Sequence, residues 1–190
     1  MSPTVLVLCT ANRCRSPMAG VLLRRAFTRA GMPVSVETAG FLPGGQGTPD
    51  EVGAALARTG VDLSRHSSRT VTSEMIAASD LVLGMERSHV RQVVALDPGA
   101  WTRTFTLKEL VRRGEHIGPR RSDETPEAWI ADAHRGRRSA ELLGADESDN
   151  VIDPMGGSQR GFDRTAEELD DLARRLATLL TPSAATASGG

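Results

Sequence analysis

The chain has 190 residues, of which 39% are hydrophobic and 25% are charged, and its formal net charge is −1. These values are typical of one folded domain with a core of its own. A net charge this close to zero provides no attraction to nucleic acid or to an anionic membrane, so we expect neither as a partner.

The amino-terminal segment indicates a protein of the cytoplasm. The apolar run 5–8 is too short for a signal peptide and has no basic segment before it, and no stretch of the chain is long enough to span a bilayer. The two cysteines, Cys9 and Cys14, are too close together to staple a secreted fold. We therefore expect a cytoplasmic protein in which both cysteines are reduced thiols.

In chain order, the first elements are a strand, a polar loop and a helix. Residues 5–8 are apolar and partly β-branched, which predicts a buried strand of a parallel sheet. After the loop 9–16 begins a helix, for which Ser16 is a good N-cap and Pro17 suits the first turn. Apolar residues then recur at helical spacing until Gly31 ends the pattern.

Strand and helix patterns continue to alternate down the chain. We expect further strands at 34–38, 81–83 and 104–106, and helices at 48–60, 73–79 and 86–96. In the less regular segment 109–144, arginines alternate with acidic residues, which predicts a solvated helical face. The last helix carries a stripe of leucines up to Leu180, and Thr165 with Glu168 resembles a capping box in its first turns.

This order of elements predicts an α/β fold with a parallel sheet. We expect one domain over residues 1–180, followed by a disordered tail at 181–190, where the residues are small and polar. Ligands of such folds bind beyond the carboxyl ends of the strands. The loop 9–16 falls at that place.

The loop after the first strand has the composition of an anion-binding site. Its sequence is Cys9-Thr10-Ala11-Asn12-Arg13-Cys14-Arg15-Ser16. A loop that enters a helix N-terminus offers converging backbone N–H groups and the positive end of the helix dipole, which suit a phosphate. Arg15 adds a planar fork that can hold two phosphate oxygens. The same donors favour the thiolate form of Cys9, so we expect one loop to supply both nucleophile and phosphate cradle.

Segment 9–19 of the sequence resembles the signature of the low-molecular-weight protein tyrosine phosphatases. The resemblance extends to about Leu180 and includes Thr38-Ala39-Gly40, segment 62–66 and Asp153-Pro154. It implies a three-layer fold, with a four-stranded parallel sheet, helices on both faces and the phosphate loop after the first strand. It also implies hydrolysis of phosphomonoesters, with protein tyrosine phosphatase activity and with no metal or cofactor.

Carried over by position, the resemblance assigns roles to individual residues. Cys9 would be the nucleophile that forms a phosphocysteine, Arg15 the phosphate clamp, and Asp153 the general acid and then base. The rest of the loop would bind the substrate's phosphate: Thr10, Ala11, Asn12, Arg13, Cys14 and Ser16. Ser16 would also hydrogen-bond the thiolate. Asn12 would hold the shape of the loop through contacts with Ser16, Thr38 and His66.

Several positions differ from the family's pattern. Met155 and Gly156 stand where aromatic residues commonly wall the pocket, and the loop 41–47 offers only Phe41. Arg13 is either a second cation at the rim, which would disfavour a cationic substrate such as phosphoarginine, or an outward-pointing solvated side chain. Gly20 replaces a frequent Glu. Segment 114–150 looks longer than usual and would form an extra lid or a partner surface.

Other functions stay open at this point. Cys14 is either a small packed side chain or the partner of Cys9 in a reversible, protective disulfide. The same scaffold supports arsenate reduction with an external thiol, and a non-catalytic phosphate-binding module is a third hypothesis. Asp153 favours hydrolysis, because a leaving-group acid matters most in that reaction. The substrate would be a phosphorylated protein or a small phosphomonoester.

Overall fold

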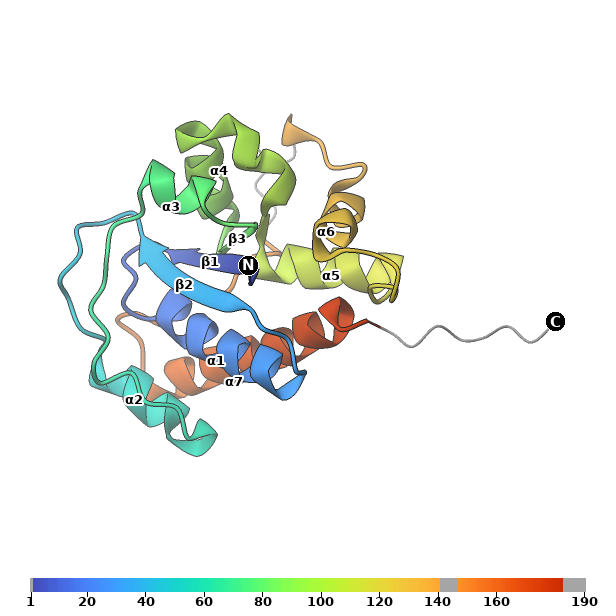
Figure 1. Ribbon diagram of the computed structural model, residues 1–190. Helices are drawn as coiled ribbons and strands as arrows, with labels where there is room; N and C mark the ends of the chain where they lie inside the picture. Colours follow the sequence, from blue (N-terminus) through green and yellow to red (C-terminus); the bar gives the residue numbers. More distant parts are fainter. Residues whose placement is uncertain (1, 141–146, 183–190) are drawn as a thin grey trace.

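The computed structural model describes residues 2–140 and 147–182 and shows a four-stranded parallel sheet between layers of helices (Figure 1). The strands are β1 (Thr4–Cys9), β2 (Ser35–Gly40), β3 (Leu81–Gly84) and β4 (Thr104–Thr106), in the order β2-β1-β3-β4. All neighbouring pairs are parallel. The predicted α/β fold with a four-stranded parallel sheet is confirmed.

Helices cover both faces of the sheet, as the resemblance implied. Their bounds are α1 (Arg15–Arg29), α2 (Asp50–Leu56), η1 (Ala57–Thr59), α3 (Ser73–Ala77), α4 (Arg87–Leu96), η2 (Pro98–Arg103), α5 (Leu107–Ile117), α6 (Pro126–His134) and α7 (Gln159–Leu180), where η marks a 3-10 helix. Helices α1 and α7 lie side by side on one face, and α3 and α4 lie on the other (Figure 1).

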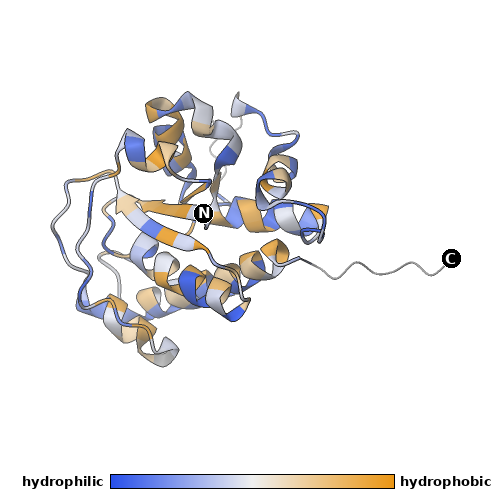
Figure 2. Ribbon diagram, viewed as in Figure 1, coloured by the Kyte–Doolittle hydropathy of each residue, from blue (hydrophilic) through white to orange (hydrophobic). Residues whose placement is uncertain are grey.

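Strand β1 is apolar from Val5 onward because it is central and buried from both sides. Val5 and Val7 belong to the larger core, which α1, α5 and α7 complete, whereas Leu6 and Leu8 belong to the smaller core beneath α3 and α4. Figure 2 shows the strand as an almost continuous hydrophobic ribbon. Burying one such side chain contributes about 1.5–3 kcal/mol, so the strand that carries the loop 9–16 is firmly held.

The carboxyl ends of the strands meet at one edge of the sheet, where the loop 9–16 lies. Cys9 is in register with Gly40 of β2, and Leu8 is in register with Gly84 of β3. A Cβ atom at Gly40 would stand 2.6 Å from the backbone nitrogen of Asn12, so a side chain here would displace the loop. Glycine at this position therefore lets β2 end against the loop.

The last helix begins earlier than its sequence pattern suggests. Helix α7 starts at Gln159, and Thr165 is a buried side chain inside it. The predicted capping box of Thr165 and Glu168 was therefore wrong. Phe162 is the first buried residue of the helix, and it precedes the leucine stripe from which the sequence pattern was read.

Segment 109–144 is not simply a solvated face, and that prediction was wrong for Arg137. This side chain is buried, pairs with Glu109 at 2.8 Å, and places its guanidinium 3.9 Å from the ring centre of Trp101 and 4.0 Å from that of Phe105. A buried guanidinium needs such partners, and they come from segments that the local pattern does not reveal. Residues 141–146, also in the predicted lid, lie outside the described residues.

The domain limits stay a proposal. The leucine stripe packs α7 onto the core as far as Leu180, in keeping with one domain over 1–180. Of the predicted tail 181–190, residues 183–190 lie outside the described part of the chain. Within the described ranges, none of the helices combines the length and the apolar character needed to cross a membrane.

Gly20 has a structural explanation that the sequence did not offer. A Cβ atom at this position of α1 would lie 2.4 Å from Cγ2 of Thr38 on β2. We expect Gly20→Ala to lower the free energy of unfolding by about 1–3 kcal/mol, because the added methyl group overpacks this contact.

The matched variant Thr38→Ser removes Cγ2 and keeps the hydroxyl. In that background Gly20→Ala is expected to raise the free energy of unfolding by about 0.5–1 kcal/mol, the usual gain of Ala over Gly inside a helix. Urea denaturation of the four proteins measures both effects. An equal loss of stability from Gly20→Ala in both backgrounds would disprove the contact as its cause.

Candidate active site

The loop 9–16 places the Cys9 thiol beside the hydroxyl of Ser16. Cys9 is the last residue of β1 and Ser16 lies in the first turn of α1, and their Sγ and Oγ atoms are 3.0 Å apart. The side-chain amide of Asn12 donates to the same Oγ at 2.9 Å. Since Asn12 fills an acceptor position, the Ser16 proton is available to Cys9, with the carbonyl of Ala39 at 3.4 Å as its weaker alternative. Ser16 thus stabilises negative charge on the sulfur.

Asn12 holds the loop in a conformation that few residues tolerate. Its φ is +52°, in the left-handed region, and the residue is fully buried. Its carbonyl accepts a hydrogen bond from Nε2 of His66 at 2.7 Å, and its side-chain oxygen accepts from the backbone N–H of Arg69 at 3.0 Å. The structure therefore brings Asn12, Ser16 and His66 together, as the resemblance implied.

Thr38 does not take the place that the resemblance implied for it. Among the hydrogen bonds of the described residues, none joins its hydroxyl to Asn12; the backbone of Arg69 supplies that contact. Thr38 acts on the loop only indirectly, because its carbonyl accepts a hydrogen bond from Nε of Arg69 at 2.7 Å. The physical reason is the methyl group of Thr38, which packs toward Gly20 of α1.

Arg15 is a buried cation held by two carboxylates. Its side chain is only 2% exposed. One terminal nitrogen contacts Glu86 and donates to the carbonyl of Val151 at 3.2 Å, and the other donates to Oδ2 of Asp153 at 2.6 Å. Asp153 is 41% exposed and lies on the solvent side of the pair. Three of the predicted residues, Cys9, Arg15 and Asp153, therefore belong to one site, although Asp153 is distant in sequence.

Two residues of this site, Glu86 and His89, were missed in the sequence. Both lie in the segment that follows β3, the strand next to β1, so their signal was a polar residue shortly after a strand in a parallel sheet. Although burial opposes ionisation of Glu86, the hydrogen bond and charge of Arg15 keep the pKa of its carboxyl below the ordinary value. Glu86 is therefore a carboxylate that anchors the clamp.

His89 is buried between Phe41 and the loop. Its ring stacks on Phe41, with 5.6 Å between ring centres, and its Nε2 lies 3.2 Å from Oγ1 of Thr10. Burial lowers the pKa of His89 to about 4, against the opposing charge of Glu86. The imidazole is therefore neutral at neutral pH.

Cys14 is a packed thiol rather than a second nucleophile. Burial, together with negative charge on Asp153 and Cys9, raises the pKa of Cys14 to about 12. Both cysteines are free in this structure. The reversible disulfide between Cys9 and Cys14 stays a prediction.

The rim of the site is formed by Arg13, Phe41 and the segment after Asp153. Arg13 is half-buried and donates from Nε to the carbonyl of Gly47 at 3.1 Å, so it is tied to the loop 41–47 rather than fully solvated. The backbone N–H groups of Phe41 and Leu42 donate to the carbonyl of Thr10 at 2.8 and 3.1 Å. The backbone N–H of Met155 donates to Oδ1 of Asp153 at 3.1 Å, which orients that carboxylate.

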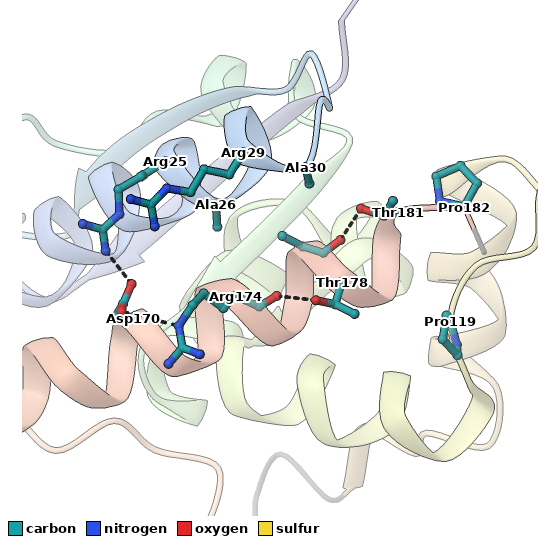
Figure 3. A pocket seen from close by; sticks show the side chains of 11 residues that line it. Arg25, Ala26, Arg29, Ala30, Pro119, Asp170, Arg174, Thr178, Thr181 and Pro182 are labelled. Atoms are coloured by element: carbon teal, nitrogen blue, oxygen red, sulfur yellow. Dashed lines mark hydrogen bonds and ion pairs between the residues drawn. The ribbon is translucent and has the colours of Figure 1, made fainter. Parts of the chain in front are cut away.

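A cavity elsewhere on the surface lacks the groups for this chemistry. Its volume is about 600 Å³, and α1 and α7 contribute most of its lining (Figure 3). Arg25 and Arg174 both point to Asp170, with which they pair at 2.6 and 3.5 Å. The cavity reaches Arg29 at the carboxyl end of α1, roughly 20 Å along the helix from Arg15. No cysteine lines it, so the candidate active site is at the loop 9–16.

Comparison with known proteins agrees with this geometry. The family described as low molecular weight phosphotyrosine protein phosphatase matches residues 4–118. A protein-arginine-phosphatase of Bacillus subtilis is 33% identical over 179 residues, which are 93% of this chain and 95% of the relative. The low molecular weight protein-tyrosine-phosphatase Etp of Escherichia coli K12 is 35% identical over 122 residues, which are 64% of this chain and 80% of the relative.

Solved structures show the same fold. A mutant of YwlE from Bacillus subtilis superposes with a TM-score of 0.68 at 30% identity, over 93% of this chain and 97% of that one. A YwlE arginine phosphatase with a phosphorylated active-site serine in place of cysteine superposes with a TM-score of 0.69 at 27% identity, over 92% of this chain and 93% of that one.

Proposed function

Since this chain belongs to the low molecular weight phosphotyrosine protein phosphatases, and is thus a phosphomonoester hydrolase, we propose that Cys9, Arg15 and Asp153 carry out its reaction. The observation that carries this assignment is that three groups lie together at the carboxyl end of β1. They are the thiol of Cys9, the buried guanidinium of Arg15 and the oriented carboxylate of Asp153. Cys9 is the nucleophile, Arg15 the clamp of the transferred phosphoryl group, and Asp153 the proton donor.

The first step transfers the phosphoryl group to sulfur. The Cys9 thiolate, stabilised by the Ser16 hydroxyl, attacks phosphorus opposite the leaving oxygen, so that an S–P bond forms as the P–O bond breaks. Backbone N–H groups at the start of α1 and the Arg15 guanidinium stabilise charge on the three non-bridging oxygens. Protonated Asp153 gives its proton to the leaving oxygen, and the product departs as an alcohol.

The second step returns the enzyme to its resting state. Asp153, now a carboxylate, takes a proton from a water molecule as that water attacks phosphorus. The S–P bond breaks, inorganic phosphate forms, and the thiolate of Cys9 is regenerated. The covalent step is supported by the related arginine phosphatase structure, in which the active-site serine carries a phosphoryl group.

The ion pairs of Arg15 place Asp153 beside the phosphate site. One terminal nitrogen of Arg15 binds Asp153 and the other binds Glu86. A phosphoryl oxygen of the substrate takes the place of Asp153 on Arg15, which leaves the carboxyl group of Asp153 to contact the leaving oxygen. Glu86 keeps the guanidinium in place.

We propose phosphotyrosine in a protein as the substrate. Phe41 supports this proposal, because it is the aromatic residue whose backbone is fastened to the loop at Thr10, where its ring can flank a flat leaving group. Phosphoarginine is a second candidate, because the protein-arginine-phosphatase of Bacillus subtilis matches nearly the full chain. Arg13 opposes that candidate, since a cation at the rim repels a guanidinium.

The setting of this activity is also a proposal. A thiol nucleophile needs a reducing compartment, and both cysteines are free thiols, so we place the protein in the cytoplasm. We propose that it acts on phosphorylated proteins; the alternative substrate is a small phosphomonoester.

A substrate comparison tests the proposed function. Purified protein under reducing conditions is assayed for phosphate release from para-nitrophenyl phosphate, from a phosphotyrosine peptide and from the matched phosphoarginine peptide. A parallel assay with arsenate and glutathione tests for arsenate reduction. We expect kcat/KM to be higher for the phosphotyrosine peptide than for the phosphoarginine peptide. Absence of phosphate release from a folded protein would refute the phosphatase, and a higher kcat/KM for phosphoarginine would refute the tyrosine preference.

The acid role of Asp153 predicts a dependence on the leaving group. Asp153→Asn keeps the size of the side chain but removes the transferable proton, so kcat should fall by roughly 10²–10⁴-fold for alkyl phosphates. The fall should be smallest for para-nitrophenyl phosphate, whose leaving oxygen needs little protonation. Steady-state rates across aryl phosphates of graded leaving-group pKa measure the effect. Equal slowing for all of them would remove Asp153 from this role.

A further inference from the structure

The hydrogen bonds of His89 determine which of its ring nitrogens carries the proton. Its Nδ1 lies 3.2 Å from the backbone nitrogen of Met85 and 3.1 Å from that of Glu86, and both of these groups are N–H donors. Nδ1 must therefore be an unprotonated acceptor. The proton of the neutral ring is on Nε2, which lies 3.2 Å from Oγ1 of Thr10. His89 consequently donates and Thr10 accepts.

The hydroxyl oxygen of Thr10 accepts a second hydrogen bond, from Arg15. A terminal nitrogen of Arg15 donates to Oγ1 of Thr10 at 3.4 Å, and this same nitrogen binds Asp153 at 2.6 Å. A hydroxyl oxygen has two acceptor positions, and N–H donors occupy both. Thr10 can therefore donate its hydroxyl proton to another group. Because His89 and Arg15 occupy the acceptor positions, this O–H bond points away from both of them.

We propose that Thr10 uses this proton as a side-chain donor to the phosphoryl group of the substrate, and that His89 is the positioning residue that aims it. The Thr10 side chain is exposed at the mouth of the loop, one residue after the nucleophile. A phosphoryl oxygen that takes the place of Asp153 on Arg15 binds the nitrogen that already contacts Thr10. Thr10 thus adds a donor to those of the backbone and Arg15.

The position of His89 is itself determined by the fold. The residue lies in the first turn of α4, where its Nδ1 also completes a capping box with Glu86. Phe41 stacks on the ring from the other loop of the site. Rotation of the ring would break both backbone contacts, so His89 presents Nε2 to Thr10 in a single orientation. This inference rests on the proposed function, because it adds a group to the same phosphate site.

Binding of inorganic phosphate, measured by titration calorimetry at pH 7, tests the inference without requiring turnover. Thr10→Val removes the hydroxyl at constant shape and should weaken phosphate binding about tenfold, as expected for a lost hydrogen bond to a charged group. Thr10→Ser keeps the hydroxyl and should stay within about twofold of wild type. His89→Gln keeps an acceptor for the capping box, since Gln suits that position, but it replaces the ring that holds Nε2 toward Thr10 with a flexible amide.

The coupling between the two residues is the decisive measurement. His89→Gln alone should weaken phosphate binding about threefold or more, but it should add nothing in the Thr10→Val background, because the group that it aims is gone. Thermal denaturation shows whether each variant is folded. Phosphate affinity of Thr10→Val within twofold of wild type, or equal effects of His89→Gln in both backgrounds, would overturn the inference.

The outcome separates this inference from the proposed function. Coupled phosphate binding in a protein that releases no phosphate from any phosphomonoester would refute the proposed function and leave the Thr10 donor standing. Normal hydrolysis with unchanged phosphate binding in Thr10→Val would refute the donor alone. Wild-type protein that binds no phosphate at all would overturn both.

Discussion

Replacing Cys9 with Ser is expected to abolish turnover, with kcat for para-nitrophenyl phosphate lowered by at least about 10⁴-fold. The loop holds the Cys9 sulfur 3.0 Å from the Ser16 hydroxyl at the start of α1, and sulfur is intrinsically a stronger nucleophile than a hydroxyl oxygen. A serine hydroxyl is far harder to ionise than a thiol, and among the described residues the side-chain hydrogen bond at position 9 goes to Ser16, which is not a base. Substitution of one atom therefore removes the nucleophile.

The measurement separates chemistry from binding. Stopped and continuous assays give the residual rate, while calorimetry with inorganic phosphate should show that the Cys9→Ser loop still binds the product, because Arg15 and the backbone donors are unchanged. A matched thermal denaturation curve controls for folding. Turnover within tenfold of wild type would show that another residue is the nucleophile.

Arg15→Lys is expected to lower kcat/KM by roughly 10²–10³-fold, the range seen when one donor to a developing negative charge is lost. The guanidinium contacts Glu86 and the carbonyl of Val151 with one nitrogen and Asp153 with the other. A lysine ammonium retains the charge but cannot reproduce this fork, and its position on a flexible stem is less defined. Comparing wild type with Arg15→Lys therefore measures the contribution of the guanidinium's geometry at constant charge.

Glu86→Gln is the matched control for this prediction. It keeps the side-chain size but removes the charge that anchors Arg15, so kcat/KM should fall by about tenfold in the wild-type background and little further in the Arg15→Lys background. Steady-state kinetics of the single and double variants give the coupling. If the two losses multiply, Glu86 acts independently of the clamp, and its anchoring role is wrong.

The sequence predicted the fold because its signals are local. The buried strand β1, the helix after the loop and the glycine at position 31 each depend on residues within a few positions of one another, and the structure confirms the parallel sheet that they imply. The predicted N-cap, Ser16, was wrong: α1 begins at Arg15 with Cys14 at the N-cap, and the Ser16 hydroxyl contacts Cys9 instead of capping the helix. The nucleophile loop is equally local, since all its donors and Cys9 lie within one short segment. Asp153 came from the resemblance, because a single Asp-Pro pair carries little information.

The sequence interpretation was wrong at positions where packing against other elements decides the environment of a side chain. Thr38 was expected to bind Asn12, but its methyl group packs toward Gly20 and the backbone of Arg69 supplies the contact. Arg137 was expected in solvent, but Glu109 and two aromatic rings surround it. In both cases the residue type allowed two environments, and only the packing of distant segments selected one.

By itself, the sequence determined the α/β class, the position of the phosphate loop and the candidate nucleophile, Cys9. Only the tertiary structure decided what surrounds that loop: the clamp of Arg15 joins Glu86, 71 positions away, and Asp153, 138 positions away, and His89 reaches Thr10 across 79 positions. For Glu86 and His89 the physical reason is the parallel sheet, which gathers the carboxyl ends of strands at one edge regardless of their separation in the chain. Asp153 lies in the segment before α7, and this segment is attached to the end of β3 by the backbone N–H of Val151, which donates to the carbonyl of Met85 at 2.8 Å. Propensity and periodicity act over a few residues, whereas the charges and hydrogen bonds of this site act between segments far apart in the chain.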